Sequence, residues 1–442
     1  MSIFKAYDIR GLYGSELDEE LARKIGAALV RLLEARTLVV GRDMRESAPS
    51  IQQAMIEGIN SQGCNVIDIG LVSTPMAYYG IGSMDADGGL TATASHNPPE
   101  YIGAKICRRD AVPVSGDTGI YEIEKMVQTE SFASVASPGT VREVDIREEY
   151  REHIQSFMRP WSGRKAVIDV ANGMGALEVP LVLEGAPLDW SGLFLELDGN
   201  FPNHEANPLK DENIADLQKA VVEQQAEVGF AFDGDADRCC VVDEKGQRIG
   251  SDLITALLSR EALEREPGAT VIYDLRSSRA LSEEIERLGG VPQKERVGHS
   301  FIKATMRETN CPFAGELSGH FYYRDHFFSD CATIAMIGVL NLMEKEQKSL
   351  SELAAPLARY HSTGEVNFVV DDPDRLIREL MAKYQDGEQD EMDGITVSYP
   401  TYWFNVRKSN TEPLLRLRLE ANTADELAQR AGELQECLGT PE

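Results

Sequence analysis

The 442-residue sequence has few of the features that mark secreted, membrane or zinc-binding proteins. Its seven cysteines form no Cys-x-x-Cys pair and no spacing suited to zinc, which favours reduced thiols in the cytosol. The longest apolar stretch, residues 332–340, is about half of the roughly 18 residues of a membrane span. The first ten residues contain no apolar signal core. We therefore expect a cytoplasmic protein with no membrane partner.

Basic residues are also scarce. The chain has 44 Lys and Arg against 73 Asp and Glu, which leaves a net charge of −29. Nucleic acids and anionic membranes both require a basic surface, so neither is an expected partner. An anionic small ligand is still compatible with this charge, provided that basic residues converge locally. The length predicts three or four domains.

Three parts of the chain repeat one pattern of strand, helix and strand. The helices between the strands predict mixed, largely parallel sheets that are covered on both faces. The expected elements are a helix at 18–35, strands at 38–41 and 66–69 around a helix at 48–62, strands at 165–170 and 193–197 around a helix at 175–184, and strands at 270–274 and 291–295 around a helix at 278–288. The pattern therefore predicts three similar α/β domains.

The last eighty residues follow a different pattern. Strands are expected at 365–370, 395–399, 402–406 and 414–420, with helices at 373–383 and 424–437. Residues 415–419 alternate apolar and basic side chains, as in a sheet with one wet face. This predicts a C-terminal α+β domain. The expected domains are 1–143, 144–247, 248–361 and 362–442.

A run of small residues from Thr91 leads to Ser95, which is followed by His96-Asn97 and two prolines. Small residues allow a phosphate or another backbone to approach, and the prolines keep Asn97 out of the helical region. Ser95 is therefore expected on a constrained loop, and Lys105 is a cation that could reach the same site. An ordinary turn is the alternative, because Ser-His-Asn-Pro is typical of turns.

Asp233, Asp235 and Asp237 stand at alternate positions in one short stretch. They place hard oxygen ligands in a small volume, where their repulsion requires a cation. A calcium EF-hand loop is disfavoured, because Arg238 stands where that loop needs Gly and residues 239–242 predict a strand. Three charged ligands with room for water or phosphate favour magnesium. A solvated acidic turn is the alternative.

Two further loops carry clustered polar side chains. The first holds Glu316, Ser318 and His320 and is preceded by Gly298-His299-Ser300, and the second holds Arg407, Ser409, Asn410 and Thr411. The first set could hydrogen-bond several sugar hydroxyls at once. The second, with its backbone amides, could hold a phosphate. Plain turns are the alternative for both.

Taken together and in this order, these motifs resemble the α-D-phosphohexomutase superfamily, and most of all its phosphomannomutase/phosphoglucomutase branch. The resemblance spans essentially the whole chain. It rests on Tyr7 to Gly11, Thr93 to Pro98, Asp233 to Arg238, Gly315 to His320 and Arg407 to Thr411. It implies four domains around a central cleft, of which three are alike and α/β and the last is of another type.

The resemblance also implies an activity, the interconversion of hexose 1-phosphate and hexose 6-phosphate, with mannose or glucose as the sugar. The route would be a phosphoserine enzyme and a hexose 1,6-bisphosphate intermediate, which is also the expected activator. Phosphoserine maps onto Ser95, and Mg²⁺ onto Ser95, Asp233, Asp235 and Asp237. The other implied roles are acid/base groups (Lys105, His299), a phosphate neighbour (Arg238), cleft residues (Arg10, Tyr7), sugar ligands (Glu316, Ser318, His320) and the site of the non-reacting phosphate (Arg407, Ser409, Asn410, Thr411).

Two positions depart from the family pattern. Ile102 stands where Asn is usual, and Cys331 ends a segment that commonly reads Asp-Asp-Gly, so a hydrogen bond or packing contact differs there. Thr93-Ala94 and Leu317 favour the mannose/glucose branch over phosphoglucosamine mutase. The expected partner is a small phosphosugar, and no feature indicates an oligomeric state.

Other functions stay open as alternatives. A phosphosugar phosphatase could use the same serine and metal with water as acceptor, and a sugar-phosphate-binding protein would need neither. A serine hydrolase is disfavoured, because the Gly-x-Ser-x-Gly elbow is absent. In addition, Ser95 and His96 are adjacent in the chain, so we do not expect them to form a nucleophile–base hydrogen bond.

Overall fold

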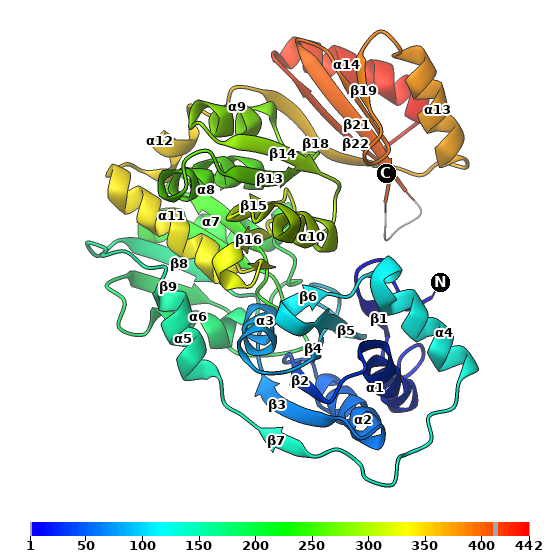
Figure 1. The fold of residues 1–442 in the computed structure, drawn as a ribbon. Coiled ribbons are helices and arrows are strands. Elements are labelled where there is room, and N and C mark those ends of the chain that lie inside the picture. Colours follow the sequence, from blue (N-terminus) through cyan, green and yellow to red (C-terminus); the bar gives the residue numbers. More distant parts are fainter. Residues whose placement is uncertain (1, 410–413, 442) are drawn as a thin grey trace.

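The computed structural model describes residues 2–409 and 414–441, which form four domains in chain order, each built on its own β-sheet (Figure 1). In this part of the chain, no helix combines the length and the apolar character needed to cross a membrane. The largest apolar core runs through the first three domains, whereas the fourth has a core of its own. The first three domains are therefore packed together more closely than the fourth.

The first domain has a seven-stranded sheet with helices on both faces. Its elements are β1 (Ile9–Leu12), α1 (Glu19–Leu33), β2 (Thr37–Arg42), α2 (Ala48–Ser61), β3 (Asn65–Leu71), α3 (Thr74–Ser83), β4 (Gly88–Ala92), β5 (Tyr101–Arg108), β6 (Val112–Pro113), α4 (Tyr121–Thr129) and β7 (Val141–Glu143). The Asp18 side chain caps α1 by accepting from Leu21 N at 2.8 Å, and α1 packs against α2. On the other face, α3 contributes Met76 and Ile81 to the core shared with the next two domains.

The second and third domains each have a five-stranded sheet. The second contains α5 (Arg147–Gln155), β8 (Lys165–Asp169), α6 (Gly175–Leu183), β9 (Asp189–Leu193), α7 (Ala215–Gln224), β10 (Val228–Phe232), β11 (Cys239–Asp243) and β12 (Arg248–Ile249). The third contains α8 (Ser251–Arg265), β13 (Thr270–Asp274), α9 (Arg279–Arg287), β14 (Val291–Glu295), α10 (His299–Thr309), β15 (Phe313–Gly315), β16 (Phe321–Tyr323), β17 (Ser329–Asp330), α11 (Ala332–Glu346) and α12 (Leu350–Ala354).

One strand order recurs in these three sheets. It reads β3-β2-β4-β5 in the first, β9-β8-β10-β11 in the second and β14-β13-β15-β16 in the third. In each, the first three strands are parallel and the fourth is antiparallel to the third. The prediction of three similar α/β domains is therefore confirmed. The turn from the third strand to the fourth carries Ser95, then the three aspartates, then Glu316 to His320.

The fourth domain has a wholly antiparallel sheet in the order β18-β22-β21-β20-β19. Its elements are β18 (His361–Phe368), α13 (Pro373–Lys383), β19 (Glu388–Asp390), β20 (Ile395–Ser398), β21 (Tyr402–Lys408), β22 (Leu415–Ala421) and α14 (Ala424–Leu438). Leu415, Leu417 and Leu419 are buried, whereas Arg416 and Arg418 between them are less so. The predicted α+β domain is therefore confirmed (orange and red in Figure 1).

One predicted strand was misplaced. We expected a strand at 193–197, but β9 ends at Leu193 and begins at Asp189. The chain turns at Phe194, whose φ is 56°, and the side chains of Leu195 and Leu197 are each 39% exposed. The apolar run was therefore a loop beyond the strand, because apolar residues alone do not separate a buried strand from a surface segment.

Candidate active site

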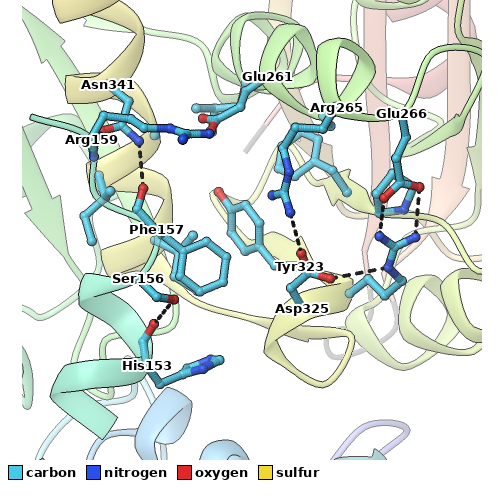
Figure 2. A pocket seen from close by; sticks show the side chains of 18 residues that line it. His153, Ser156, Phe157, Arg159, Glu261, Arg265, Glu266, Tyr323, Asp325 and Asn341 are labelled. Atoms are coloured by element: carbon cyan, nitrogen blue, oxygen red, sulfur yellow. Dashed lines mark hydrogen bonds and ion pairs between the residues drawn. The ribbon is translucent and has the colours of Figure 1, made fainter.

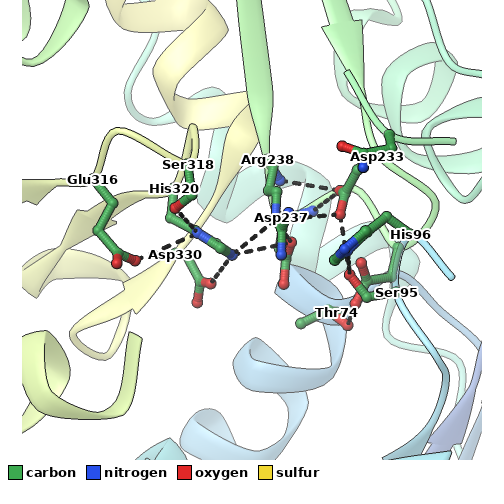
Figure 3. A network of polar contacts seen from close by, with 12 residues as sticks. Thr74, Ser95, His96, Asp233, Asp237, Arg238, Glu316, Ser318, His320 and Asp330 are labelled. Carbon is green, nitrogen blue, oxygen red and sulfur yellow. Dashed lines mark hydrogen bonds and ion pairs between the residues drawn. The ribbon is translucent and has the colours of Figure 1, made fainter. Parts of the chain in front are cut away.

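The serine loop, residues 93–100, joins β4 to β5 and holds Ser95 in the left-handed backbone region, with φ at 50°. This conformation is unfavourable for a residue other than glycine, so the surroundings must hold it. Ser95 N donates to Thr93 Oγ1 at 3.0 Å, and the residue is 1% exposed. Its hydroxyl donates to Asp233 Oδ2 at 3.1 Å (Figure 3). The serine of the first domain thus lies against the acidic loop of the second.

His96 corrects one of our expectations. Its Nδ1 lies 3.2 Å from Ser95 Oγ, although we had expected no such contact between adjacent residues. The left-handed backbone at Ser95 brings the two side chains within hydrogen-bonding distance. Burial lowers the pKa of His96 well below its usual value, and Arg238 and Arg10 lower it further. The ring is therefore neutral at pH 7, but the sequence still lacks the nucleophile elbow of a serine hydrolase.

The acidic loop, residues 233–238, lies between β10 and β11. Asp233, Asp235 and Asp237 are each at most 1% exposed, and one carboxylate oxygen of each lies within 4.8 Å of the others. No described residue donates a hydrogen bond to Asp235 Oδ1 or Asp237 Oδ1, although His320 Nε2 lies 3.5 Å from Asp237 Oδ1. Buried carboxylate oxygens without a donor are costly unless a cation binds them. This donor set fits Mg²⁺, which prefers a few carboxylates and completes its shell with water or phosphate.

Two side chains of the first domain hold the acidic loop. Lys105 Nζ on β5 lies 2.6 Å from Asp235 Oδ2 and also pairs with Asp237, and Thr74 Oγ1 donates to Asp235 Oδ2 at 2.6 Å. Burial raises the pKa of Asp233 well above its usual value, and the charges of Asp237 and Asp235 raise it further. Burial also opposes ionisation of Asp237, but Lys105, His320 and Arg238 together outweigh it, and the pKa lies well below its usual value. One ammonium thus offsets part of the charge of three carboxylates.

The third domain closes the other side of the acidic loop (Figure 3). Arg238 Nε donates to His320 Nε2 at 3.3 Å and lies 3.7 Å from Asp233 Oδ2. His320 Nδ1 lies 2.8 Å from Ser318 Oγ. The backbones also meet, because Cys239 N donates to Gly319 O at 3.0 Å. The predicted sugar loop and the predicted metal loop are therefore in direct contact.

Three more residues of the predicted site lie in the predicted sugar loop or beside it: Glu316, His299 and Tyr7. Glu316 is buried and accepts from Gly298 N at 3.1 Å and from Tyr322 Oη. The His299 ring centroid lies 5.5 Å from that of Tyr7 and 6.3 Å from that of His320. Burial lowers the pKa of His299 well below its usual value, with Lys303 and Lys105 adding to the effect. His299 is therefore a neutral imidazole, able to accept a proton.

Arg10 also reaches the serine loop. Its guanidinium pairs with Asp8 and donates to Asn97 Oδ1, two residues after Ser95.

The two positions that depart from the family pattern are both buried. Ile102 is packed in the core of the first domain, and Cys331 Sγ lies 3.8 Å from Tyr150 Oη. Ile102 therefore makes packing contacts, and Cys331 makes a hydrogen-bonding contact inside the core.

Arg407, the first residue of the fourth predicted loop, lies near the end of β21 and belongs to a separate charge cluster. Arg407 Nη2 lies 2.9 Å from Glu365 Oε2, and the same carboxylate lies 3.2 Å from Arg276 and 3.1 Å from Arg416. Arg276 belongs to the third domain, so the cluster joins the third and fourth domains. Ser409 ends the described part of β21's loop, and Asn410 and Thr411 lie outside the described residues.

Glu365→Gln is expected to destabilise the fourth domain at neutral pH. Burial opposes ionisation of Glu365, but Arg276, Arg407 and Arg416 outweigh it and lower its pKa from 4.5 to about 2. This difference corresponds to about 3 kcal/mol of stability, which is fully present above pH 4.5 and is lost as the pH falls through about 2.

Calorimetry of both proteins at pH 7 and pH 3.5 measures this effect. The Tm of the variant should be several degrees lower at pH 7 and nearer to that of the wild type at pH 3.5. Glu388→Gln, at an exposed position on β19, is the matched control and should leave the Tm unchanged. Equal Tm differences at the two pH values would contradict the assignment.

A pocket also lies elsewhere, between α5 of the second domain and α8 and α11 of the third (Figure 2). It has a volume of about 600 Å³, and none of the predicted site residues that the structure describes lines it. Arg159 and Arg265 at its rim pair with Glu261 and Asp325, and Arg324 pairs with Glu266. This pocket is therefore separate from the place where the serine loop and the acidic loop meet.

Three side chains at the site were not found by sequence reasoning. They are Thr74 at the start of α3, Arg45 in the turn between β2 and α2, and Lys303, whose Nζ lies 2.6 Å from Asp330 Oδ1. Arg45 carried a signal, since polar residues at the carboxyl end of a parallel strand are typical of sites. Thr74 and Lys303 carried none, because Thr74 reaches Asp235 through the packing of one domain against another and Lys303 reaches Asp330 only through the fold of the third domain.

Comparisons with known proteins agree with this arrangement. Family models described as phosphoglucomutase/phosphomannomutase match residues 1–134 (alpha/beta/alpha domain I), 148–246 (domain II), 250–360 (domain III) and 365–436 (C-terminal domain). A phosphomannomutase of Methanocaldococcus jannaschii is 38% identical over 99% of this chain and 98% of its own.

Solved structures are similar as well. A phosphoglucomutase/phosphomannomutase family protein of Burkholderia thailandensis superposes with a TM-score of 0.92 at 35% identity, covering 99% of this chain and 97% of its own. An N-acetylphosphoglucosamine mutase of Aspergillus fumigatus, solved with GlcNAc-6P and magnesium, shares the fold with a TM-score of 0.59 at 15% identity, over 91% of this chain and 82% of its own.

Proposed function

Because the chain belongs to the phosphoglucomutase/phosphomannomutase family of phosphotransferase isomerases, we propose that it interconverts the 1- and 6-phosphates of mannose and glucose through a phosphorylated Ser95. The observation that carries the proposal is the contact of 3.1 Å between Ser95 Oγ and Asp233 Oδ2. It places a hydroxyl that can carry a phosphoryl group beside a buried carboxylate cluster and two cations, Lys105 and Arg238. Phosphoryl transfer requires this combination of positioning and charge stabilisation.

Asp233, Asp235 and Asp237, with an oxygen of phosphoserine, would hold Mg²⁺. When bound, the metal would offset negative charge on the transferring phosphoryl group. The fit rests on two buried carboxylate oxygens, Asp235 Oδ1 and Asp237 Oδ1, to which no described residue donates a hydrogen bond. The magnesium complex of the Aspergillus fumigatus mutase is consistent with this role.

Side chains of the protein would carry out the other parts of phosphoryl transfer. In the first half-reaction, the bond between Ser95 Oγ and phosphorus breaks, and a bond forms from phosphorus to the free hydroxyl of the hexose monophosphate. The hydroxyl proton passes to a general base, and His299 is the candidate because its buried Nδ1 has no hydrogen-bond partner among the described residues. Lys105, which is paired with two carboxylates, serves as a cation that stabilises the transferring group.

The bisphosphate so formed then turns end over end, and Ser95 takes back a phosphoryl group from the other end. Arg407, Ser409, Asn410 and Thr411 would hold the phosphate that does not react, in both orientations. Glu316, Ser318 and His320 would bind the sugar hydroxyls. Free hexose 1,6-bisphosphate would act as an activator, because it restores the phosphate on Ser95. The partner of this site is a small phosphosugar.

A coupled assay tests the substrate class. With Mg²⁺ and a trace of hexose 1,6-bisphosphate, mannose and glucose 1-phosphates should be converted at rates within about tenfold of each other, because they differ only at carbon 2. Glucosamine 1-phosphate should be converted at least about tenfold more slowly than either, because it carries a charged ammonium in place of the carbon-2 hydroxyl and that charge must be desolvated.

Two results would replace the proposal. Release of inorganic phosphate as fast as isomerisation would favour a phosphosugar phosphatase. Faster conversion of glucosamine 1-phosphate than of mannose or glucose 1-phosphate would favour a phosphoglucosamine mutase. Omitting the bisphosphate from enzyme that has been dephosphorylated is the control, and turnover should then lag until bisphosphate is added.

A further inference from the structure

One guanidinium binds four backbone carbonyls of the serine loop and its end. Arg45 Nη2 donates to the carbonyls of Ser95 and Asn97 at 2.8 and 2.6 Å. Its Nη1 donates to those of Pro98 and Tyr101 at 2.7 and 3.1 Å. Arg45 is 1% exposed, although it carries a charge and lies in a turn. A buried arginine that donates four hydrogen bonds to the carbonyls of one loop fixes the backbone path of that loop.

Arg45 is in turn held in place by Asp43. Arg45 Nε lies 3.3 Å from Asp43 Oδ2, and Asp43 Oδ1 accepts from Arg45 N at 2.9 Å. Asp43 N donates to the carbonyl of Ala92, at the end of β4. Asp43 and Arg45 therefore connect the carboxyl end of β2 with the loop that begins where β4 ends.

The carbonyl of Ser95 also touches the acidic loop. A Cβ built on Gly234 would lie 2.5 Å from the carbonyl oxygen of Ser95, so the backbone of the acidic loop packs directly against the atom that Arg45 binds. The Arg45 guanidinium also lies 5.3 Å from the ring centroid of Phe201 in the second domain. Arg45 therefore lies where the serine loop and the domain that carries the aspartates meet.

We propose that Arg45 is a positioning residue for phosphoryl transfer, which holds Ser95 in its left-handed conformation with Oγ directed at the acidic loop. The inference goes beyond the proposed function and rests on Ser95 as the phosphoryl carrier. Arg45 contacts no predicted substrate group and acts through the backbone of the serine loop. A planar fork of donors is needed for four convergent carbonyls, and a lysine ammonium cannot supply it.

Arg45→Lys is expected to lower kcat about 100-fold, because a displacement of about 1 Å in a reacting group costs roughly that factor. KM for hexose 1-phosphate and the Kd for Mg²⁺ should stay within about twofold, because the residues that bind them are intact. Labelling of Ser95 from a hexose 1,6-bisphosphate should slow by the same factor as kcat. Arg23→Lys, a partly exposed arginine paired with Glu57, is the control and should match the wild type.

Chemical rescue distinguishes the positioning role of the Arg45 guanidinium from the effect of its positive charge alone. In Arg45→Ala, methylguanidinium should restore a measurable part of kcat, whereas methylammonium at the same ionic strength should not. Asp43→Asn leaves Arg45 in place and weakens its orientation, so it should lower kcat about tenfold with KM unchanged. This variant carries the test if the Arg45 variants do not fold.

The inference is overturned by wild-type kcat in folded Arg45→Lys or in Asp43→Asn, or by equal rescue with the two cations. A wild-type protein without mutase turnover would instead overturn the proposed function, so the two failures are distinguishable.

Discussion

Ser95→Ala is expected to lower mutase turnover at least about 10⁴-fold, since removing a covalent carrier takes away the whole catalytic route and not one contact within it. The hydroxyl is buried against Asp233, so the variant removes one donor and leaves little empty space. Its fold should therefore be preserved. The measurement is the coupled assay with mannose 1-phosphate, together with intact-mass analysis after incubation with hexose 1,6-bisphosphate.

The wild type should gain the mass of one phosphoryl group, and the variant should gain none. Ser137→Ala, in the exposed loop before β7, is the matched control and should both turn over and take up phosphate like the wild type. Turnover of Ser95→Ala near the wild-type rate would remove Ser95 from the mechanism. Phosphate uptake by the variant would show that another side chain is the carrier.

Much of this site could be predicted from the sequence because its parts are short and local. Thr93 to Pro98, the three alternating aspartates and the Glu316 to His320 loop each carry their chemistry within about six residues. The repeated strand–helix–strand pattern also predicted the fold class. What the pattern did not reveal is that the three loops occupy the same turn, from the third strand to the fourth, in three domains with one strand order.

The remaining features depend on contacts between segments that are far apart in the chain. Arg45 follows the carboxyl end of a parallel strand, which is a weak signal of a site, but its contacts with residues about fifty positions away are not visible in the sequence. Thr74 reaches Asp235 in another domain, and no local pattern marks it. The contact between Ser95 and His96 depends on a positive φ at Ser95, a conformation that composition does not indicate. These contacts result from packing between distant segments and from backbone strain, and the periodicity of apolar residues in the sequence predicts neither.

Lys105→Met is expected to change activity and metal affinity in opposite directions. The Lys105 ammonium lies 2.6 Å from Asp235 and also pairs with Asp237, so it competes electrostatically with a divalent cation at the same carboxylates. Methionine keeps a similar length without the charge. The Kd for Mg²⁺ should fall by about tenfold, whereas kcat should fall about 10³-fold because a cation at the transferring phosphoryl group is lost.

Isothermal titration of dephosphorylated enzyme with Mg²⁺ measures the Kd. The coupled assay, with hexose 1,6-bisphosphate present, measures kcat. Lys24→Met, at an exposed position on α1, is the control and should alter neither value. Without metal, the variant should have a lower Tm than the wild type, because buried carboxylates lose their counter-ion, and Mg²⁺ should raise its Tm more than that of the wild type. A variant that merely folded badly would lose metal affinity together with activity. Lower kcat together with tighter Mg²⁺ binding is expected only if the Lys105 ammonium and the metal compete for the same carboxylate oxygens. Weaker Mg²⁺ binding by Lys105→Met would therefore contradict this account of the acidic loop.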